Sequence, residues 1–361
     1  LKYHVGSRQA CLNGSVRPTV ALLHSRGCGR RPMSVKLPEP PQDCISRVRF
    51  APFQGSRHLL VSSWDENLRL YDAASESLIG LQKHSLAILD CAFLQDPVHA
   101  VSAGLEGRLS FYDFQVQQEL QLGSERHAEA IRCLEFHPPT QQVFTGSWDA
   151  TLRAWDPRQP AIPTQVIPLG TKCFALDAAM DRVVVGGADR HIHIFDVRRL
   201  GMALERRESS PKHQIRSLKI GIDQRAFASS SVEGRVALEY FDEERNRRGR
   251  YAFKCHREKE SNGEETVHPV NALAFHPVHG TFATGGSDGG VCIWDGFARK
   301  RLWRLQPFDT AVSSLCFSSD GSHLAIGVSY TFDDGEKIPP PATKIVIRQI
   351  AESDVLPKGE T

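Results

Sequence analysis

The chain has 361 residues, of which 40% are hydrophobic and 24% charged, and its formal net charge is +2. This composition is typical of a soluble globular protein, and the near balance of charge excludes an overall attraction to a polyanion such as nucleic acid. The sequence has no run of about 18 apolar residues, so we expect no membrane-spanning helix. Length alone suggests about two domains.

Residues 1–32 form a basic leader that we expect to lie outside the fold. They include several arginines and no acidic residue, a composition that resembles a mitochondrial transit peptide. Translated upstream sequence or a disordered tail are the alternatives. We favour these alternatives because Met33 stands where the first strand of the fold is expected.

The rest of the chain is built from repeats that end in an aromatic residue followed by aspartate. Successive pairs lie 41, 43, 40, 46 and 53 residues apart, which fits the period of about 40–45 residues of WD40 repeats. Each such repeat forms one four-stranded blade of a propeller. The pairs are Tyr71-Asp72, Tyr112-Asp113, Trp155-Asp156, Phe195-Asp196, Phe241-Asp242 and Trp294-Asp295.

Each repeat contains three clear strand patterns and a weaker fourth. In the third repeat, residues 131–136, 143–147 and 151–155 alternate apolar and polar side chains as half-buried strands do, and Asp149-Ala150 form a tight turn. The fourth pattern is illustrated by residues 77–81. Seven segments have the pattern of a first strand, and they begin at Ile45, Ile88, Ile131, Cys173, Ile215, Val270 and Val312.

We therefore predict an all-β, seven-bladed WD40 propeller over residues 33–350, with residues 351–361 as a C-terminal tail. The last blade carries an acidic, proline-rich insertion at 331–341 and lacks an outer strand of its own. A closed ring requires that strand. Ser34–Leu37 is the candidate, so we expect the N-terminal strand to pair with the last blade and close the ring.

The third repeat also contains a set of residues that could be read as catalytic. His127, a hydroxyl from Thr145 or Ser147, Asp149 and Trp155 match the network that WD40 blades bury. A His-Asp-Ser set also suggests a hydrolase. We favour the structural role because the same Asp turn recurs in other repeats without a serine elbow.

The cysteines indicate neither a disulfide framework nor a metal site. All nine are scattered, with no CxxC pair and no zinc spacing. We expect reduced, buried thiols in an intracellular compartment, no metal and no cofactor.

Four cations are expected on the face of the ring where the first strands begin. Aligning the repeats at these strands places Arg132 and Arg216 at the same position, near the rim of the central channel. Aligning them at the Asp turn brings Arg235 to the same face, and the outer strand of blade five carries Lys254 there. Arg216, Arg235 and Lys254 should converge on blade five, where cations of this kind can bind phosphate or carboxylate groups.

Five stretches of the chain go beyond the general propeller pattern: residues 60–65, 143–158, 206–210, 233–240 and 251–257. With them, the chain from about Met33 to Ile350 closely resembles the WD40 family of the mitotic spindle checkpoint, the budding-uninhibited-by-benzimidazole family. The sister family of nuclear mRNA export and nucleoporin-binding propellers shares part of this pattern, including Gly234-Arg235-Val236.

The resemblance implies a non-enzymatic adaptor that binds acidic segments of checkpoint kinases and of their pseudokinase relative, and phosphothreonine motifs of a kinetochore scaffold. By resemblance, the phosphothreonine-binding cations fall on Arg235 and Lys254, and Arg216 contacts the acidic segment. Trp64 and Trp148 match family positions on the same face. We expect Arg132 to contact the partner segment as well, because it lies at the channel rim.

Further partners and locations follow from the same resemblance. We expect the inhibitor assembly of the anaphase-promoting complex as a partner, a monomeric ring within heteromeric complexes, and a location in the nucleus, at mitotic kinetochores and in the cytoplasm. We expect no membrane partner. The basic run at 245–251 is the candidate for nucleic-acid binding, but nearby acidic residues dilute it, so we interpret it as a solvated loop. The runner-up function is mRNA export.

Overall fold

The computed structural model describes residues 33–120, 125–159, 161–259, 261, 263–333 and 335–358. The described fold lies in one compact unit, residues 32–361. The predicted leader, residues 1–32, lies outside the described residues. Among the described residues, no helix is long and apolar enough to cross a membrane.

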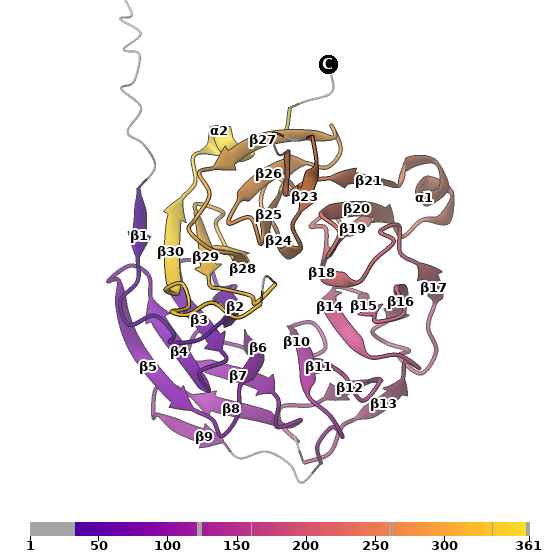
Figure 1. The fold of residues 1–361 in the computed structure, drawn as a ribbon. Helices are drawn as coiled ribbons and strands as arrows, with labels where there is room; N and C mark the ends of the chain where they lie inside the picture. Colours follow the sequence, from indigo (N-terminus) through magenta and orange to yellow (C-terminus); the bar gives the residue numbers. More distant parts are fainter. Residues whose placement is uncertain are drawn as a thin grey trace, which may run out of the picture. The chain divides into compact units, whose positions relative to one another are not determined.

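Seven four-stranded antiparallel sheets are arranged in a ring in this unit, as the repeats predicted (Figure 1). Blade one contains β2 (Ile45–Phe50), β3 (His58–Ser63), β4 (Asn67–Asp72) and β5 (Ser77–Lys83). Blade two contains β6 (Ile88–Phe93), β7 (His99–Gly104), β8 (Leu109–Asp113) and β9 (Gln118–Leu120). Blade three contains β10 (Ile131–His137), β11 (Gln142–Ser147), β12 (Thr151–Trp155) and β13 (Gln165–Pro168).

The remaining blades have the same order. Blade four contains β14 (Cys173–Ala179), β15 (Arg182–Gly187), β16 (His191–Asp196) and β17 (Glu205–Glu208). Blade five contains β18 (Ile215–Ile220), β19 (Ala226–Ser231), β20 (Arg235–Tyr240) and β21 (Tyr251–Lys254). Blade six contains β24 (Val270–Phe275), β25 (Phe282–Gly286), β26 (Val291–Asp295) and β27 (Lys300–Leu305). Blade seven contains β28 (Val312–Phe317), β29 (His323–Val328), β30 (Lys344–Gln349) and β1 (Ser34–Lys36).

The N-terminal strand closes the ring, which confirms the prediction. β1 pairs antiparallel with β30, with Ser34 opposite Arg348 and Lys36 opposite Val346. The Leu37 backbone N–H then donates to Ile345 at 2.9 Å, and the Leu37 side chain is buried in the apolar layer between blades seven and one. β1 thus supplies hydrogen-bond partners for the backbone of β30, which would otherwise be an open edge of the last blade.

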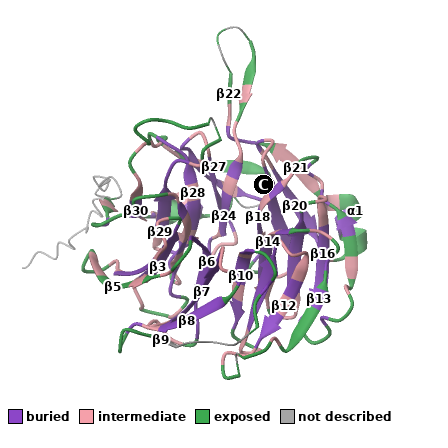
Figure 2. Cartoon of the chain, turned by 60° about the horizontal axis from the view of Figure 1, so that its bottom comes forward, coloured by how far each residue is buried: buried purple, intermediate pink, exposed green. Residues whose placement is uncertain are grey.

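The core lies between the blades. Within the described residues, seven apolar clusters fill the interfaces between neighbouring sheets. Figure 2 shows the buried strands and the exposed loops at their ends. Because both faces of each sheet pack against a neighbour, the middle strands are almost wholly buried, as in His58–Ser63.

Blade three contains the hydrogen-bonded network that the sequence suggested. His127 Nδ1 lies 2.8 Å from Asp149 Oδ2, and His127 Nε2 lies 2.8 Å from the hydroxyl of Thr145. Trp155 Nε1 donates to the same hydroxyl at 2.8 Å. Ser147 instead accepts a hydrogen bond from the Asp149 backbone N–H at 3.0 Å.

This geometry favours the structural role over the hydrolase. Thr145 is fully buried and its hydroxyl already contacts two side chains, so no substrate in solvent reaches it. Blade six repeats the network through His256, Asp288, Thr284 and Trp294, with Nε2 of His256 at 2.8 Å from the Thr284 hydroxyl.

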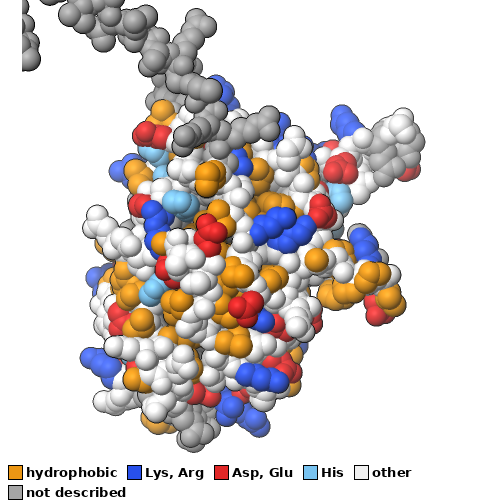
Figure 3. Space-filling model, turned by 90° about the vertical axis from the view of Figure 1, so that its left-hand side faces the viewer, with side chains coloured by type: hydrophobic (Ala, Val, Ile, Leu, Met, Phe, Trp, Pro, Cys, Tyr) orange, Lys and Arg blue, Asp and Glu red, His pale blue; other side chains and the backbone are white. Residues whose placement is uncertain are grey.

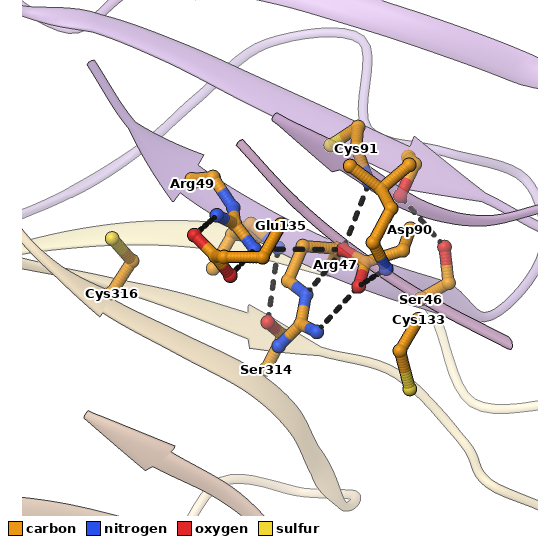
Figure 4. Close-up of polar contacts among 12 residues, drawn as sticks. Ser46, Arg47, Arg49, Asp90, Cys91, Cys133, Glu135, Ser314 and Cys316 are labelled. Carbon is orange, nitrogen blue, oxygen red and sulfur yellow. Dashed lines mark hydrogen bonds and ion pairs between the residues drawn. The ribbon is translucent and has the colours of Figure 1, made fainter. Parts of the chain in front are cut away.

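A network of buried charged side chains links the innermost strands of neighbouring blades. Its residues follow the first residues of these strands along the chain. Arg47 Nε lies 2.7 Å from Asp90 Oδ1, and Arg49 Nη2 lies 3.0 Å from Glu135 Oε2 (Figure 4). Burial opposes ionisation of Asp90, but the Arg47 guanidinium outweighs it and lowers the pKa of Asp90 to about 2. The network joins the innermost strands of blades one to five through Arg47, Arg49, Lys219, Asp90, Glu135 and Asp177.

Three local elements differ from the sequence-based expectation. Part of the basic run expected as a loop is a short helix, α1 (Glu243–Gly249), capped by Asp242, whose carboxylate accepts from the Arg245 backbone N–H at 2.7 Å. A hairpin of β22 (Arg257–Lys259) and β23 (Glu265–Val267) projects from the ring (Figure 2). The expected tail includes α2 (Glu352–Val355), whose Val355 is buried in the cluster between blades six and seven.

Candidate peptide-binding face

A cavity of about 470 Å³ lies at the mouth of the central channel. We call it the channel-mouth cavity, and the face of the ring on which it lies the top face. The four residues predicted to bind a partner segment, Trp64, Arg132, Trp148 and Arg216, all line it. The other lining residues are Asp43, Cys44, Ile45, Ser46, Leu89, Asn271, Ser313, Thr331 and Phe332.

A repeated backbone irregularity marks the residues at this mouth. In all seven innermost strands the pairing register shifts around the second residue, for example between Ile131 and Cys133. Such a β-bulge leaves one residue unpaired and re-aims its side chain. Arg132 and Arg216, which the sequence alignment placed together, are two of these seven positions. The full set is Ser46, Leu89, Arg132, Phe174, Arg216, Asn271 and Ser313.

The cavity contains polar atoms whose hydrogen-bonding capacity is unused. Trp148 Nε1, Arg216 Nε and Asn271 Oδ1 are buried atoms with no hydrogen-bond partner in the part of the chain that the structure describes. Buried polar atoms without a partner are rare in native proteins. Two donors and one acceptor are therefore buried and unpaired in residues that line the cavity, which also contains two arginines.

The two tryptophans occupy equivalent turns of blades one and three. The Trp64 backbone N–H donates to Cys44 at 2.9 Å and that of Trp148 to Ala130 at 3.0 Å. The Trp64 side chain is 42% exposed, whereas Trp148 is half-buried. The turns thus hold two large aromatic surfaces at the rim, a residue type enriched in peptide interfaces.

Arg235 and Lys254, predicted to bind phosphothreonine, are neighbours on the two outer strands of blade five. They lie directly opposite each other in the β20–β21 pairing, which puts their side chains on the same face of the sheet. Each has a carboxylate nearby: Arg235 Nε lies 3.4 Å from Glu233 Oε2, and Lys254 Nζ lies 3.4 Å from Glu265 Oε2.

Arg216 does not converge with these two cations, so that expectation is wrong. Arg216 lies on the innermost strand β18, whereas Lys254 lies on the outermost strand β21, with two strands between them. The Arg216 guanidinium pairs instead with Asp333 at 3.1 Å. Burial lowers the pKa of Arg216, and the Asp333 carboxylate opposes that effect. Blade five therefore offers two separate cationic positions.

Three contributors to the top face were not predicted from the sequence: Ser287, Asp333 and the unpaired oxygen of Asn271. The acidic insertion was visible in the sequence, but its contact with Arg216 spans 117 residues. Among the described residues, no group of three His, Cys, Asp or Glu side chains is placed to hold a metal ion.

The basic run at 245–251 does not extend into a basic surface. Arg247 and Arg248 each pair with a glutamate one turn earlier on α1. Figure 3 shows the opposite side of the ring from α1, and there too acidic and basic side chains are interspersed. A nucleic-acid site of the kind considered above requires a continuous basic stripe with aromatics between.

The fold and the repeated network define a WD40 propeller. The family model "WD domain, G-beta repeat" matches residues 119–156 and 260–295. The crystal structure of RRP9 WD40 repeats superimposes with a TM-score of 0.74 over 89% of this chain and 99% of that chain, at 19% sequence identity, which supports the fold.

The full-length comparisons identify the family within that class. Mitotic checkpoint protein BUB3.1 of Arabidopsis thaliana is 44% identical over 329 residues, which cover 90% of this chain and 94% of that protein. mRNA export factor GLE2 of Chaetomium thermophilum is 31% identical over 309 residues, covering 83% and 85%. The chain belongs to the mitotic checkpoint BUB3 family of WD40 proteins, as the sequence motifs suggested, with the export factors as a sister family.

Proposed function

We propose that this protein is a non-enzymatic adaptor of the spindle assembly checkpoint, which binds acidic segments of checkpoint kinases and their pseudokinase relative on its top face. The observation that carries the proposal is the channel-mouth cavity, where Arg132, Arg216, Trp64 and Trp148 meet beside unpaired polar atoms. Arginines and exposed aromatic rings suit an acidic peptide with apolar side chains. A rigid ring presents them at fixed spacing, so an unstructured segment can be bound across several blades.

The second part of the proposal is a phosphothreonine site at Arg235 and Lys254, which would read repeated motifs of a kinetochore scaffold. A phosphate brings nearly two negative charges. It would compete with Glu233 and Glu265 for the two cations, and its higher charge favours it over either carboxylate. Binding would thus depend on a kinase and be reversed by a phosphatase.

These two sites together give the adaptor its role. Holding a kinase segment near the channel and a scaffold motif at blade five would recruit the kinase to kinetochores. The protein would act in the nucleus, at mitotic kinetochores and in the cytoplasm, as a monomeric ring within heteromeric complexes, including the inhibitor assembly of the anaphase-promoting complex.

Calorimetric titration of full-length variants tests both sites. Arg216→Glu should weaken the kinase-derived acidic peptide more than the phosphopeptide. Arg235→Glu, alone or with Lys254→Glu, should abolish the preference for phosphothreonine peptide because it places like charge at the phosphate. Arg198→Glu is the matched control, since Arg198 is an exposed arginine on blade four, paired with Asp196.

Two outcomes would contradict these assignments. If Arg235→Glu still discriminates the phosphorylated peptide about tenfold, or about 1.4 kcal/mol, the phosphate site lies elsewhere. If Arg216→Glu weakens the acidic peptide no more than Arg198→Glu does, the acidic segment does not use the channel-mouth cavity.

The alternative is a role in mRNA export, supported by the 31% identity to GLE2. Recovery of the protein from mitotic cells, followed by identification of the proteins bound to it, separates the two. Checkpoint kinases would support the adaptor proposal, and nucleoporins without kinases would support the export role.

A further inference from the structure

A loop of blade seven places a carboxylate of this chain against the proposed peptide site. Thr331 and Phe332 line the channel-mouth cavity, and Asp333 follows them. Asp333 Oδ1 accepts a hydrogen bond from Arg216 Nη2 at 3.1 Å, and Asp333 Oδ2 accepts from the Ser287 hydroxyl at 2.5 Å. Two donors from two other blades therefore hold both oxygens of one carboxylate.

The hydrogen bonds around Ser287 set its hydroxyl to donate. Asn271 Nδ2 donates to Ser287 Oγ at 3.0 Å and also approaches the Val312 carbonyl at 3.2 Å. Because the amide NH₂ is a donor only, Ser287 Oγ accepts there and its own proton points to an acceptor. A hydroxyl fixed in this way favours an anion over a hydrogen-bond donor at the position of Asp333.

The Arg216–Asp333 ion pair is partly exposed to solvent. The side chains are 29% and 25% exposed, so the pair is accessible to a competing anion. A second cavity of about 430 Å³ is lined by Ser287, Thr331 and Asp333 among others. Thr331 lines both cavities, so a segment that crosses from one to the other meets Thr331 and Asp333.

We propose that Asp333 is an internal competitor for the acidic segment at Arg216, and that Ser287 is a second hydrogen-bond donor to the carboxylate bound there. An acidic side chain of a bound segment gains Arg216 and Ser287 only by displacing Asp333. This proposal rests on the proposed binding of acidic segments at Arg216, and it adds to that function the competing carboxylate and the second donor. The loop thus raises the threshold for binding, so that weakly acidic peptides are excluded.

The test uses full-length protein and two probes: an acetylated, amidated hexaglutamate peptide and the acidic segment of a checkpoint kinase. Asp333→Asn keeps the shape of the side chain and removes the competing charge. We expect it to tighten binding of both probes about fivefold, equivalent to an ion pair of about 1 kcal/mol. Glu336→Gln is the matched control, because Glu336 is an exposed carboxylate on the same loop, and it should change binding about twofold or less.

Ser287 is tested in the Asp333→Asn background, where the internal competitor is gone. There Ser287→Ala should weaken both probes roughly tenfold, as expected for a lost hydrogen bond to a charged group. Ser319→Ala is its control: Ser319 lines neither of the two cavities, and its hydroxyl donates to the Phe53 carbonyl at 3.0 Å. Thermal melts of every variant establish that it is folded.

The outcomes separate this proposal from the proposed function. If the kinase segment binds the wild type but Asp333→Asn matches Glu336→Gln, the subsite proposal is overturned and the adaptor function stands. If hexaglutamate binds with the expected response to Asp333→Asn and Ser287→Ala but the kinase segment does not bind, the subsite stands and the partner is wrong. If neither probe binds any variant, both are overturned.

Discussion

Blades one and three share an Asp turn but stabilise it with different side chains. In blade three the carboxylate of Asp149 contacts the His127 imidazole at 2.8 Å. In blade one the carboxylate of Asp65 is held by both terminal nitrogens of Arg69, at 2.9 and 2.7 Å. The same backbone turn is thus fixed by a titratable ring in one blade and by a permanent cation in the other.

The difference predicts different responses to acid. Burial lowers the pKa of His127 to about 4, although Asp149 opposes this, so the ring is neutral at pH 7. Burial would raise the pKa of Asp65, but the hydrogen bonds from Arg69 outweigh it and lower that pKa to about 2. Blade three should therefore weaken in mildly acidic solution, whereas blade one should weaken only in strong acid.

The largest expected effect comes from the tryptophan of blade three. Trp155 is 2% exposed and completes the network through Thr145, so Trp155→Ala should lower the free energy of unfolding by about 3–5 kcal/mol. Trp148→Ala is the matched control, since Trp148 lines the channel-mouth cavity and should affect peptide binding more than stability. Equal thermal melts of the two variants would show that the roles are misassigned.

The next largest loss of stability is expected from removing the closing strand β1. Leu37, which follows this strand, packs in the cluster between blades seven and one, far along the chain from blade three. Deletion through Leu37 should cost roughly 2–4 kcal/mol, because a buried leucine and the β1–β30 pairing are lost. Hydrogen exchange should increase in blades seven and one and remain slow in blade three. Deletion of residues 1–32 is the control and should leave the melting temperature nearly unchanged; a large drop would place the boundary of the fold further upstream.

The acid response itself gives a third, smaller effect. The folded pKa of His127 lies below its unfolded value of about 6.5, so its contribution is present above pH 6.5 and is lost as the pH falls toward 4. Between pH 6.5 and 5 this amounts to about 2 kcal/mol. Denaturant unfolding of wild type and His127→Asn measures it, and the variant should show a flatter pH dependence across that interval.

Blade one supplies the contrast for this measurement. The folded pKa of Asp65 is lowered, so the stabilisation by its pairing with Arg69 persists above the unfolded pKa of about 3.9 and is lost as the pH falls toward 2. Arg69→Met should therefore lower the free energy of unfolding by nearly the same amount at pH 6.5 and at pH 5. A cost that shrinks over this interval as much as that of His127→Asn would remove the distinction between the two blades.

The smallest effect on stability is expected at the rims of the same two turns. Trp64→Ala and Trp148→Ala should each cost about 1 kcal/mol or less, since neither ring belongs to the buried clusters. Titration with the acidic peptide should separate them: Trp148 has an unpaired Nε1, so Trp148→Phe should weaken binding, whereas Trp64→Phe should retain most of it. The reverse order would assign the polar contact to blade one.

Much of the ring was accessible from the sequence because its signals are local. The aromatic–Asp pairs and alternating strands predicted seven blades, and the missing outer strand of blade seven predicted the pairing of Ser34–Lys36 with β30. Alignment of the first strands also found the positions that carry the β-bulges at the channel mouth. Each of these signals is read within one repeat or by comparing one repeat with the others.

Contacts between blades were decided by the tertiary structure alone. Arg49 meets Glu135 across 86 residues, and Arg216 meets Asp333 across 117, distances at which periodicity says nothing about partners. The sequence placed Arg216 on the first strand and Lys254 on the outer strand of blade five and predicted that the two would converge. In the structure two strands separate them, and Arg216 pairs with Asp333 instead. Strand identity is encoded by local alternation, whereas the pairing of charges depends on how ring closure brings distant repeats together.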